Sequence, residues 1–123
     1  MLRYGFAALA ALIGITHNAA AAGNAKHGEQ VFGRCAQCHN AKKGGGNGLG
    51  PNLSGVAGRK AASLPNFYYS PALKNSGIVW TDAKLKLWLA NPQKLVPGTR
   101  MAFAGLKQPQ DVDDVIAYLH SKK

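Results

Sequence analysis

A length of 123 residues fits a single domain, and the formal charge of +10 comes from basic residues spread along the chain, not packed into one tail. Such a charge often indicates nucleic-acid binding, but the chain lacks an aromatic-basic RNA signature and begins with an export signal, and both argue against that class. A basic surface that steers encounters with acidic proteins or an anionic membrane fits the sequence better.

The first 22 residues are predicted to be a cleavable signal peptide. Arg3 gives a short positive start, Phe6 to Ile15 is an apolar run, and the alanine tract at 19–22 offers an A-x-A cleavage site before Gly23. The apolar run is too short to span a bilayer comfortably, so an uncleaved anchor is the less favoured alternative. We therefore expect a periplasmic domain over residues 23–123.

The first helix is predicted to begin after Asn24, which can cap it, and to continue into a pair of cysteines. Gly28, Val31, Phe32 and Cys35 follow the i, i+3, i+4, i+7 spacing of one helical face. A glycine inside a helix costs about 0.5–1 kcal/mol relative to alanine. Gly28 therefore indicates either a close approach by another helix or a glycine with no special role.

Cys35-Ala36-Gln37-Cys38-His39 is the stretch around which the rest of the chain is organised. In the C-x-x-C-H motif of c-type haem attachment, both thiols bond to one porphyrin and the adjacent imidazole reaches the iron. A redox disulfide would be typical of a βαβ setting, and zinc would need four ligands. These are the only two cysteines, so the sequence predicts one haem c bound through Cys35 and Cys38, with His39 as an axial ligand.

The glycine-rich residues 42–50 predict a loop, and Pro51 fixes the backbone where that loop returns. Ser70 and Pro71 predict the cap and first position of a short helix that ends near Gly77. Thr81 is expected to cap a further helix that Pro92 stops. The buried face of that helix is expected to comprise Leu85, Trp88 and Leu89.

The last helix is predicted to open at Pro109, with three acids that favour the start of a helix. Those acids are Asp111, Asp113 and Asp114, and the expected buried face comprises Val112, Val115, Ile116 and Leu119. No strand pattern exceeds a few residues. The predicted fold class is all-α, with three main helices, one short helix and long loops wrapped around the haem.

Met101 is the candidate for the second axial ligand, because it is the only methionine after the predicted signal peptide and lies in an aperiodic loop that follows Pro97-Gly98. A methionine alone is as often core filler. His27 and His120 are the alternative ligands, although His27 is expected to point away and His120 lies near the carboxyl end. A thioether opposite an imidazole would close the sixth iron position, which suits electron transfer more than the binding of oxygen or peroxide.

Over residues 24–121 the chain resembles the class I cytochromes c, both the mitochondrial type and its bacterial counterparts. The similarity rests on the motif at 35–39 and, in order, on Gly50–Leu53, Gly58–Lys60, Gly77–Trp80, Asn91-Pro92, Pro97–Met101, Phe103–Gly105 and Ile116–Leu119. It implies a monomeric single-electron carrier that shuttles between membrane-bound redox complexes and is not an enzyme. The alternatives are a haem enzyme or gas-binding sensor with a vacatable sixth position, and a haem-free disulfide module.

The resemblance also implies roles for individual residues. Cys35 and Cys38 would form the thioethers, and the Pro51 carbonyl would accept a hydrogen bond from His39. The residues expected to hydrogen-bond around the haem propionates are Arg59, Tyr69 and Trp80. Phe103 would cover the haem edge, and Gly28 and Phe32 would meet Tyr118 where the first and last helices cross. A basic rim for docking on acidic partner faces would include Arg34, Lys94, Arg100 and Lys107.

Two positions depart from the family pattern. Leu73 stands where the family usually has asparagine, and Trp88 stands where it has the tyrosine beside the methionine sulfur. Both replace groups of an internal polar network, and an indole donates one hydrogen bond but accepts none. The family's buried-water arrangement is therefore not expected here. Arg100 replaces the usual lysine before the methionine, which keeps the charge.

Overall fold

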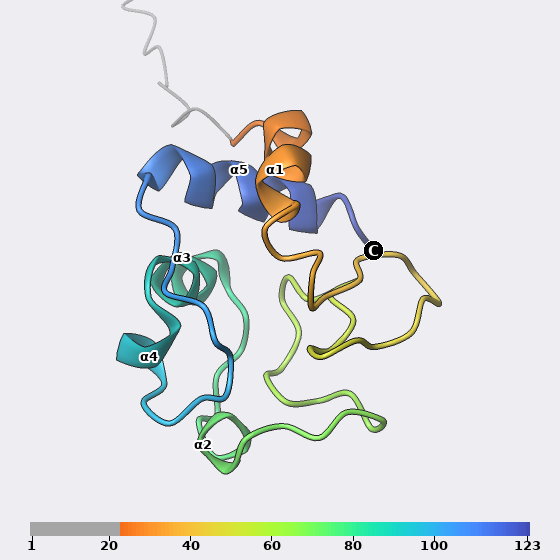
Figure 1. Cartoon of the computed structure of the whole chain (residues 1–123), viewed down its shortest axis with the longest axis vertical. Helices are drawn as coiled ribbons and strands as arrows, with labels where there is room; N and C mark the ends of the chain where they lie inside the picture. The colour runs from red at the N-terminus through yellow and green to blue at the C-terminus, as the bar shows by residue number, and fades with distance from the viewer. Residues whose placement is uncertain (1–22) are drawn as a thin grey trace, which may run out of the picture.

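The computed structural model describes residues 23–123, and the predicted signal peptide at 1–22 lies outside the described residues. The helices are α1 (Ala25–Phe32), α2 (Pro71–Lys74), α3 (Asp82–Ala90), α4 (Pro92–Leu95) and α5 (Pro109–His120). Over 23–123 the only strand-like pairing is an isolated bridge between Lys60 and Val79, so the all-α expectation is confirmed. Long irregular segments connect α1 to α2 and α4 to α5 (Figure 1).

Helices α1 and α5 cross at the top of Figure 1, although they lie near opposite ends of the chain. A Cβ atom at Gly28 would overlap the Asp114 carbonyl and would lie 2.9 Å from Tyr118 Cβ. The Phe32 and Tyr118 rings pack at a tilt, with their centroids 5.1 Å apart. The expected meeting of Gly28 and Phe32 with Tyr118 is confirmed, and Gly28 marks a close helix approach.

A buried carboxylate ties the start of α1 to α5. Asn24 caps α1 as predicted, because its side chain accepts from the backbone N–H groups of Lys26 and His27. Asp114 in turn accepts from the Asn24 N–H at 2.7 Å and from Gln110 Nε2 at 2.8 Å, and it lies 2.6 Å from His27 Nδ1. These hydrogen bonds, led by that of Asn24, hold the pKa of Asp114 below its ordinary value.

Several predicted boundaries need correction. Helix α1 ends at Phe32 and does not continue into the cysteine motif, and α2 ends at Lys74 rather than near Gly77. Pro92 does end α3, but it also begins α4, which was not predicted. The Asn91 side chain caps α4 by accepting from Lys94 N at 3.2 Å, and proline suits the first position of a helix.

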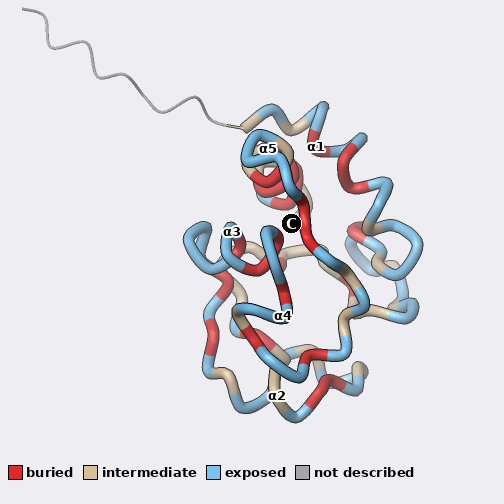
Figure 2. The backbone as a smooth tube through the Cα atoms, turned by 60° about the vertical axis from the view of Figure 1, so that its left-hand side comes forward, coloured by how far each residue is buried: buried red, intermediate tan, exposed pale blue. Residues whose placement is uncertain are grey.

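Helix α5 packs against both α1 and α3, and the core comprises buried residues of these helices and of the loops; Figure 2 shows the buried segments of α3 and α5 facing inward. The buried face predicted for α3 is confirmed, as is that of α5, where Val115 is only 1% exposed. Burying one such aliphatic side chain contributes about 1.5–3 kcal/mol. Within residues 23–123, no helix is both long enough and apolar enough to cross a bilayer.

Candidate haem-binding site

The cysteine motif follows α1 as a separate turn. Cys35 N and Ala36 N both donate to the Phe32 carbonyl, and His39 N donates to the Cys35 carbonyl at 2.9 Å. Both thiols are free; Cys35 is half-buried and Cys38 is exposed. Burial raises the pKa of the Cys35 thiol, and the positive charge of Arg34 partly offsets that shift. These backbone hydrogen bonds therefore bring Cys35, Cys38 and His39 into one turn without a continuous helix.

The His39 ring is fixed by the loop that returns toward the motif. Its Nδ1 lies 2.7 Å from the Pro51 carbonyl oxygen, the contact that the resemblance implied, so Nε2 remains free to bind a metal. Gly50 lies flat against the ring, because a Cβ there would come within 2.7 Å of Nδ1 and 2.8 Å of Nε2. Burial lowers the pKa of His39, opposed by the hydrogen bond to Pro51, and a neutral imidazole is the form that ligates metals.

A buried amide that the sequence analysis missed organises this loop. Asn52 Nδ2 donates to the carbonyls of Lys42 and Gly45, at 3.0 and 2.8 Å, and its Oδ1 accepts from Ser54 N. Asn52 therefore stabilises the glycine-rich loop through hydrogen bonds, since glycines offer that loop no side chains to pack. The signal was present, since asparagine after a Gly-Pro pair is a residue that hydrogen-bonds neighbouring backbone in turns.

Met101 is half-buried in a loop anchored at both ends. On one side Gln93 Nε2 donates to the Thr99 carbonyl at 2.8 Å, and on the other Leu106 N donates to the Leu89 carbonyl at 2.8 Å. The half-buried Phe103 donates its N–H to the Met101 carbonyl.

The Arg34 guanidinium lies 5.6 Å from the Phe103 ring centroid. Because Arg34 directly precedes Cys35, this contact links the loop that carries Met101 (the methionine loop) to the turn that carries Cys35 and Cys38.

Arg59 links the three residues implied at the propionates. Arg59 and Trp80 are neighbours, because Trp80 N donates to the Arg59 carbonyl at 2.9 Å. The Arg59 guanidinium donates to the carbonyls of Ser54 and Asn52, and burial lowers its pKa. Tyr69 is also buried and lies near Arg59, where it partly offsets the lowering of the Arg59 pKa, and its hydroxyl accepts from Leu64 N at 3.3 Å.

The two tryptophans, Trp80 and Trp88, pack edge to face with their ring centroids 5.1 Å apart. Both are buried, at 7% and 8% exposure. Trp88 lies on α3 and Trp80 lies just before it, so the contact packs α3 against the segment that leads into it.

The alternative histidine ligands each have a ring nitrogen next to a carboxylate. His27 Nδ1 lies 2.6 Å from Asp114, and His120 Nε2 lies 2.7 Å from Asp82. Each carboxylate orients its imidazole within the helical part of the molecule. Neither contact involves the methionine loop.

The donor set fits a haem c. Two free thiols share one turn with an imidazole whose Nδ1 is hydrogen-bonded, and the half-buried thioether lies on a separately anchored loop. Sulfur and nitrogen donors of this kind are the protein ligands of cytochrome haem iron.

The cytochrome c family model matches residues 25–123. The chain belongs to the cytochrome c family. Cytochrome c2 of Rhodomicrobium vannielii is 51% identical over 83% of this chain and 82% of its own length, and cytochrome c of Sesamum indicum is 47% identical over 83% and 93%. The solved structure of cytochrome cH from Methylobacterium extorquens is 50% identical, with a TM-score of 0.77, over 81% of this chain and all of its own.

Membership of this family establishes the cofactor and the general role. The chain binds one covalent haem c through its C-x-x-C-H motif, and it is a soluble electron carrier, not an enzyme. It exchanges electrons with redox partners, as cytochromes c do. Nothing in the family match or in these relatives favours the haem enzyme or gas sensor.

Proposed function

We propose that this cytochrome c is an exported carrier whose iron is ligated by His39 and Met101, with thioethers from Cys35 and Cys38. When bound, the haem supplies the Fe(III)/Fe(II) couple. The hydrogen bond between His39 Nδ1 and the Pro51 carbonyl is the observation that carries the proposal, because it orients the ring, leaves Nε2 as the ligand and raises its basicity. The anchored loop would limit movement of the Met101 sulfur and so keep the sixth position closed.

The ligand set is tested by spectroscopy of the purified holoprotein. We expect a low-spin ferric spectrum with the weak near-infrared band of iron–methionine charge transfer. Met101→Ala should abolish that band and make the reduced protein bind carbon monoxide, whereas His120→Gln should leave both properties unchanged. A native protein without the band, or one that binds carbon monoxide freely, would contradict the assignment.

The partners are proposed to be acidic faces of membrane redox complexes, contacted by the basic rim of Arg34, Lys94, Arg100 and Lys107. All four side chains are exposed, and none belongs to an ion pair within residues 23–123. The five acidic residues of the chain lie on α1, α3 and α5, which carry none of the rim residues; they are Glu29, Asp82, Asp111, Asp113 and Asp114. A basic rim without interspersed acids would speed encounters with an acidic partner and make them sensitive to salt.

Docking is tested by the rate of electron transfer to a purified membrane oxidase that accepts cytochrome c. The double variant Lys94→Gln/Lys107→Gln should slow the second-order rate severalfold at low salt, whereas Lys26→Gln/Lys84→Gln removes two charges from the helical part and should change it little. The difference should vanish at high ionic strength, where charges are screened within a few ångströms. Equal effects of the two double variants would refute docking by the rim.

Export is proposed from the apolar run and alanine tract at 1–22, which precede the region matched by the family model. The expected mature chain begins near Gly23 and is periplasmic. The intact mass of the protein recovered from a periplasmic fraction measures the cleavage position. A mass that includes residues 1–22 would contradict cleavage.

A further inference from the structure

The two residues directly before Met101 are held by two different elements. The Thr99 carbonyl accepts from Gln93 Nε2 at 2.8 Å, and Gln93 lies on α4. The Arg100 guanidinium carbon lies 5.0 Å from the centroid of the Tyr68 ring, and Tyr68 lies shortly before α2. The backbone and a side chain next to the proposed iron ligand are therefore contacted from separate parts of the chain.

Helix α4 holds Gln93 in a fixed place. Pro92, at the start of the helix, is fully buried, and its carbonyl accepts from Val96 N at 2.9 Å. Thr99 N donates to the Val96 carbonyl at 3.1 Å, and Thr99 is itself buried. The Thr99 carbonyl therefore meets the Gln93 amide from a fixed backbone, which limits the entropy lost when this hydrogen bond forms.

The segment before α2 fixes the backbone of Tyr68 in a similar way. The buried ring of Tyr69 packs edge to face against Phe67, with the two centroids 4.9 Å apart. The Asn66 carbonyl accepts from Asn47 Nδ2 at 3.2 Å, which ties the segment to the glycine-rich loop. The Tyr68 side chain is 79% exposed, so a solvent-facing ring is presented to the methionine loop from an anchored backbone.

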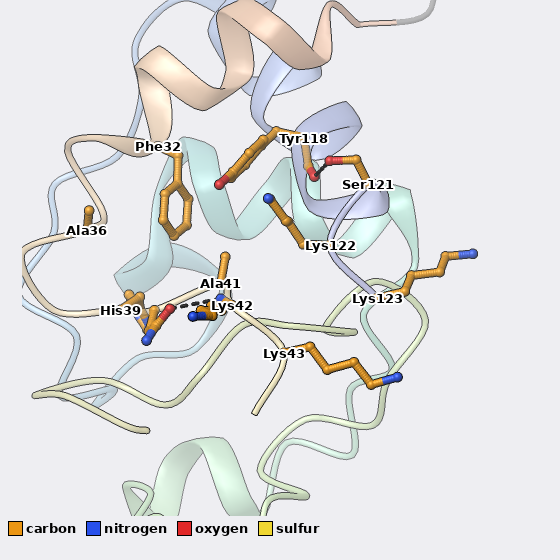
Figure 3. Close-up of a pocket in the computed structure, with 11 residues that line it drawn as sticks. Phe32, Ala36, His39, Ala41, Lys42, Lys43, Tyr118, Ser121, Lys122 and Lys123 are labelled. Atoms are coloured by element: carbon orange, nitrogen blue, oxygen red, sulfur yellow. Dashed lines mark hydrogen bonds between the residues drawn. The ribbon is translucent and has the colours of Figure 1, made fainter. Parts of the chain in front are cut away.

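The methionine loop runs past α2 in Figure 1 and lies close to it, because a Cβ at Gly98 would be 3.5 Å from Ala72 Cβ. The imidazole side of the site has different surroundings. His39 borders a groove of about 750 Å³, and the residues that line this groove come from 32–43 and 118–123 (Figure 3). Those walls lie outside the methionine loop, so the residues before Met101 depend on α4 and on the segment before α2.

We propose that Gln93 and Tyr68 are positioning residues that keep the Met101 sulfur on the iron. The proposal rests on the ligand set of the proposed function, and it adds to that set two side chains that act through Thr99 and Arg100. For the sulfur to leave the iron, the residues next to it have to move, and that movement breaks both contacts. Each contact therefore lowers the fraction of molecules in which the sixth position is open.

The two contacts should differ in strength. The hydrogen bond of Gln93 is partly buried and joins uncharged groups, which corresponds to about three- to tenfold in the open fraction. The ring of Tyr68 is mostly in solvent, where cation–π attraction is weak, and its contact corresponds to about two- to threefold. Loss of the Gln93 amide should therefore open the site more than loss of the Tyr68 ring.

Titration of the ferric holoprotein with imidazole measures the open fraction, with the near-infrared band of iron–methionine charge transfer as the signal. Imidazole replaces Met101 only after the sulfur has left, so its apparent dissociation constant falls in proportion as the open fraction rises. Gln93→Leu should lower that constant about three- to tenfold, and Tyr68→Ser about two- to threefold. Tyr68→Phe keeps the ring and should behave like the native protein. In an Arg100→Gln background, Tyr68→Ser should have no further effect.

Two controls separate positioning from a general loss of stability. Gln30→Leu makes the same substitution at an exposed glutamine of α1 and should leave the constant unchanged. Gly28→Ala disturbs the packing of α1 on α5. It should destabilise the whole fold but change the imidazole constant by less than about twofold, because the methionine loop opens locally.

An unchanged constant in Gln93→Leu or in Tyr68→Ser would remove that residue from the assignment. Tightening in Gly28→Ala as large as in Gln93→Leu would refute positioning altogether. Equal effects of Tyr68→Phe and Tyr68→Ser would show that the ring does not hold Arg100. These failures are distinct from failure of the ligand set, in which the native protein lacks the near-infrared band.

Discussion

Replacing Gly28 by alanine tests the packing of α1 on α5. The added Cβ would lie 2.5 Å from the Asp114 carbonyl carbon and 2.9 Å from Tyr118 Cβ, whereas ordinary contact begins at 3.4 Å. The nearest obstacles are backbone atoms of α5, which cannot rotate away, so the two helices have to separate by about 1 Å. That separation also loosens the contact between Phe32 and Tyr118.

The expected cost follows from opposing terms. Overpacking against a fixed backbone costs about 3 kcal/mol, at the upper end of its usual range, and a loosened aromatic pair about 0.5–1 kcal/mol more. Alanine returns about 1 kcal/mol through its better helix propensity. We therefore expect Gly28→Ala to lower the free energy of unfolding by about 2–3 kcal/mol, which moves the guanidinium midpoint down by about 0.5–1 M.

Guanidinium unfolding of the holoprotein, followed by circular dichroism, measures this shift. Gly46→Ala is the matched control, because no heavy atom lies within 4 Å of a Cβ at that position. The control should move the midpoint by less than about 0.2 M. If Gly28→Ala behaves like Gly46→Ala, the close approach of the two helices is wrong.

Three further predictions concern the haem site and the buried carboxylate. Gly50→Ala should push the His39 ring out of position, seen as a lower yield of holoprotein and a weaker near-infrared band. Asp114 has a lowered pKa in the folded protein, so its stabilisation is present above about pH 4 and is lost as the pH falls further. Asp114→Asn should therefore melt below the native protein at pH 7 and converge with it in acid, as measured by thermal unfolding against pH. Trp88→Tyr should shift the reduction potential in a redox titration, and an unchanged value would show that Trp88 does not tune the iron.

The helices were predictable where local chemistry sets them. Asn24, Ser70 and Thr81 each cap the helix predicted to follow them. A short polar side chain directly before a helical segment can accept hydrogen bonds from the first backbone N–H groups of that helix. Asn91 caps α4 in the same way, but the sequence analysis interprets Pro92 only as the end of the preceding helix. A proline can end one helix and open the next, and sequence alone does not separate the two roles.

Long-range contacts were harder to predict. Of the three acids near the start of α5, only Asp111 lies in the first turn, where a carboxylate favours the helix dipole wherever it points, so the sequence assigns Asp114 no contact of its own. Which of them is buried depends on α1, whose first N–H groups need an acceptor. The contact of Arg34 with Phe103 was also missed, since it joins segments that no local pattern relates.

The hydrogen bond from Asn24 to Asp114 joins positions 90 residues apart, so folding is complete only when α5 packs against α1. Bringing such distant segments together costs about 4 kcal/mol of chain entropy. Nearly the whole polypeptide must therefore be present before α1 can find its partner, and a fragment that ends before Pro109 would leave the apolar face of α1 in water. Shortening this carrier from its carboxyl end would consequently damage the half of the molecule that is made first.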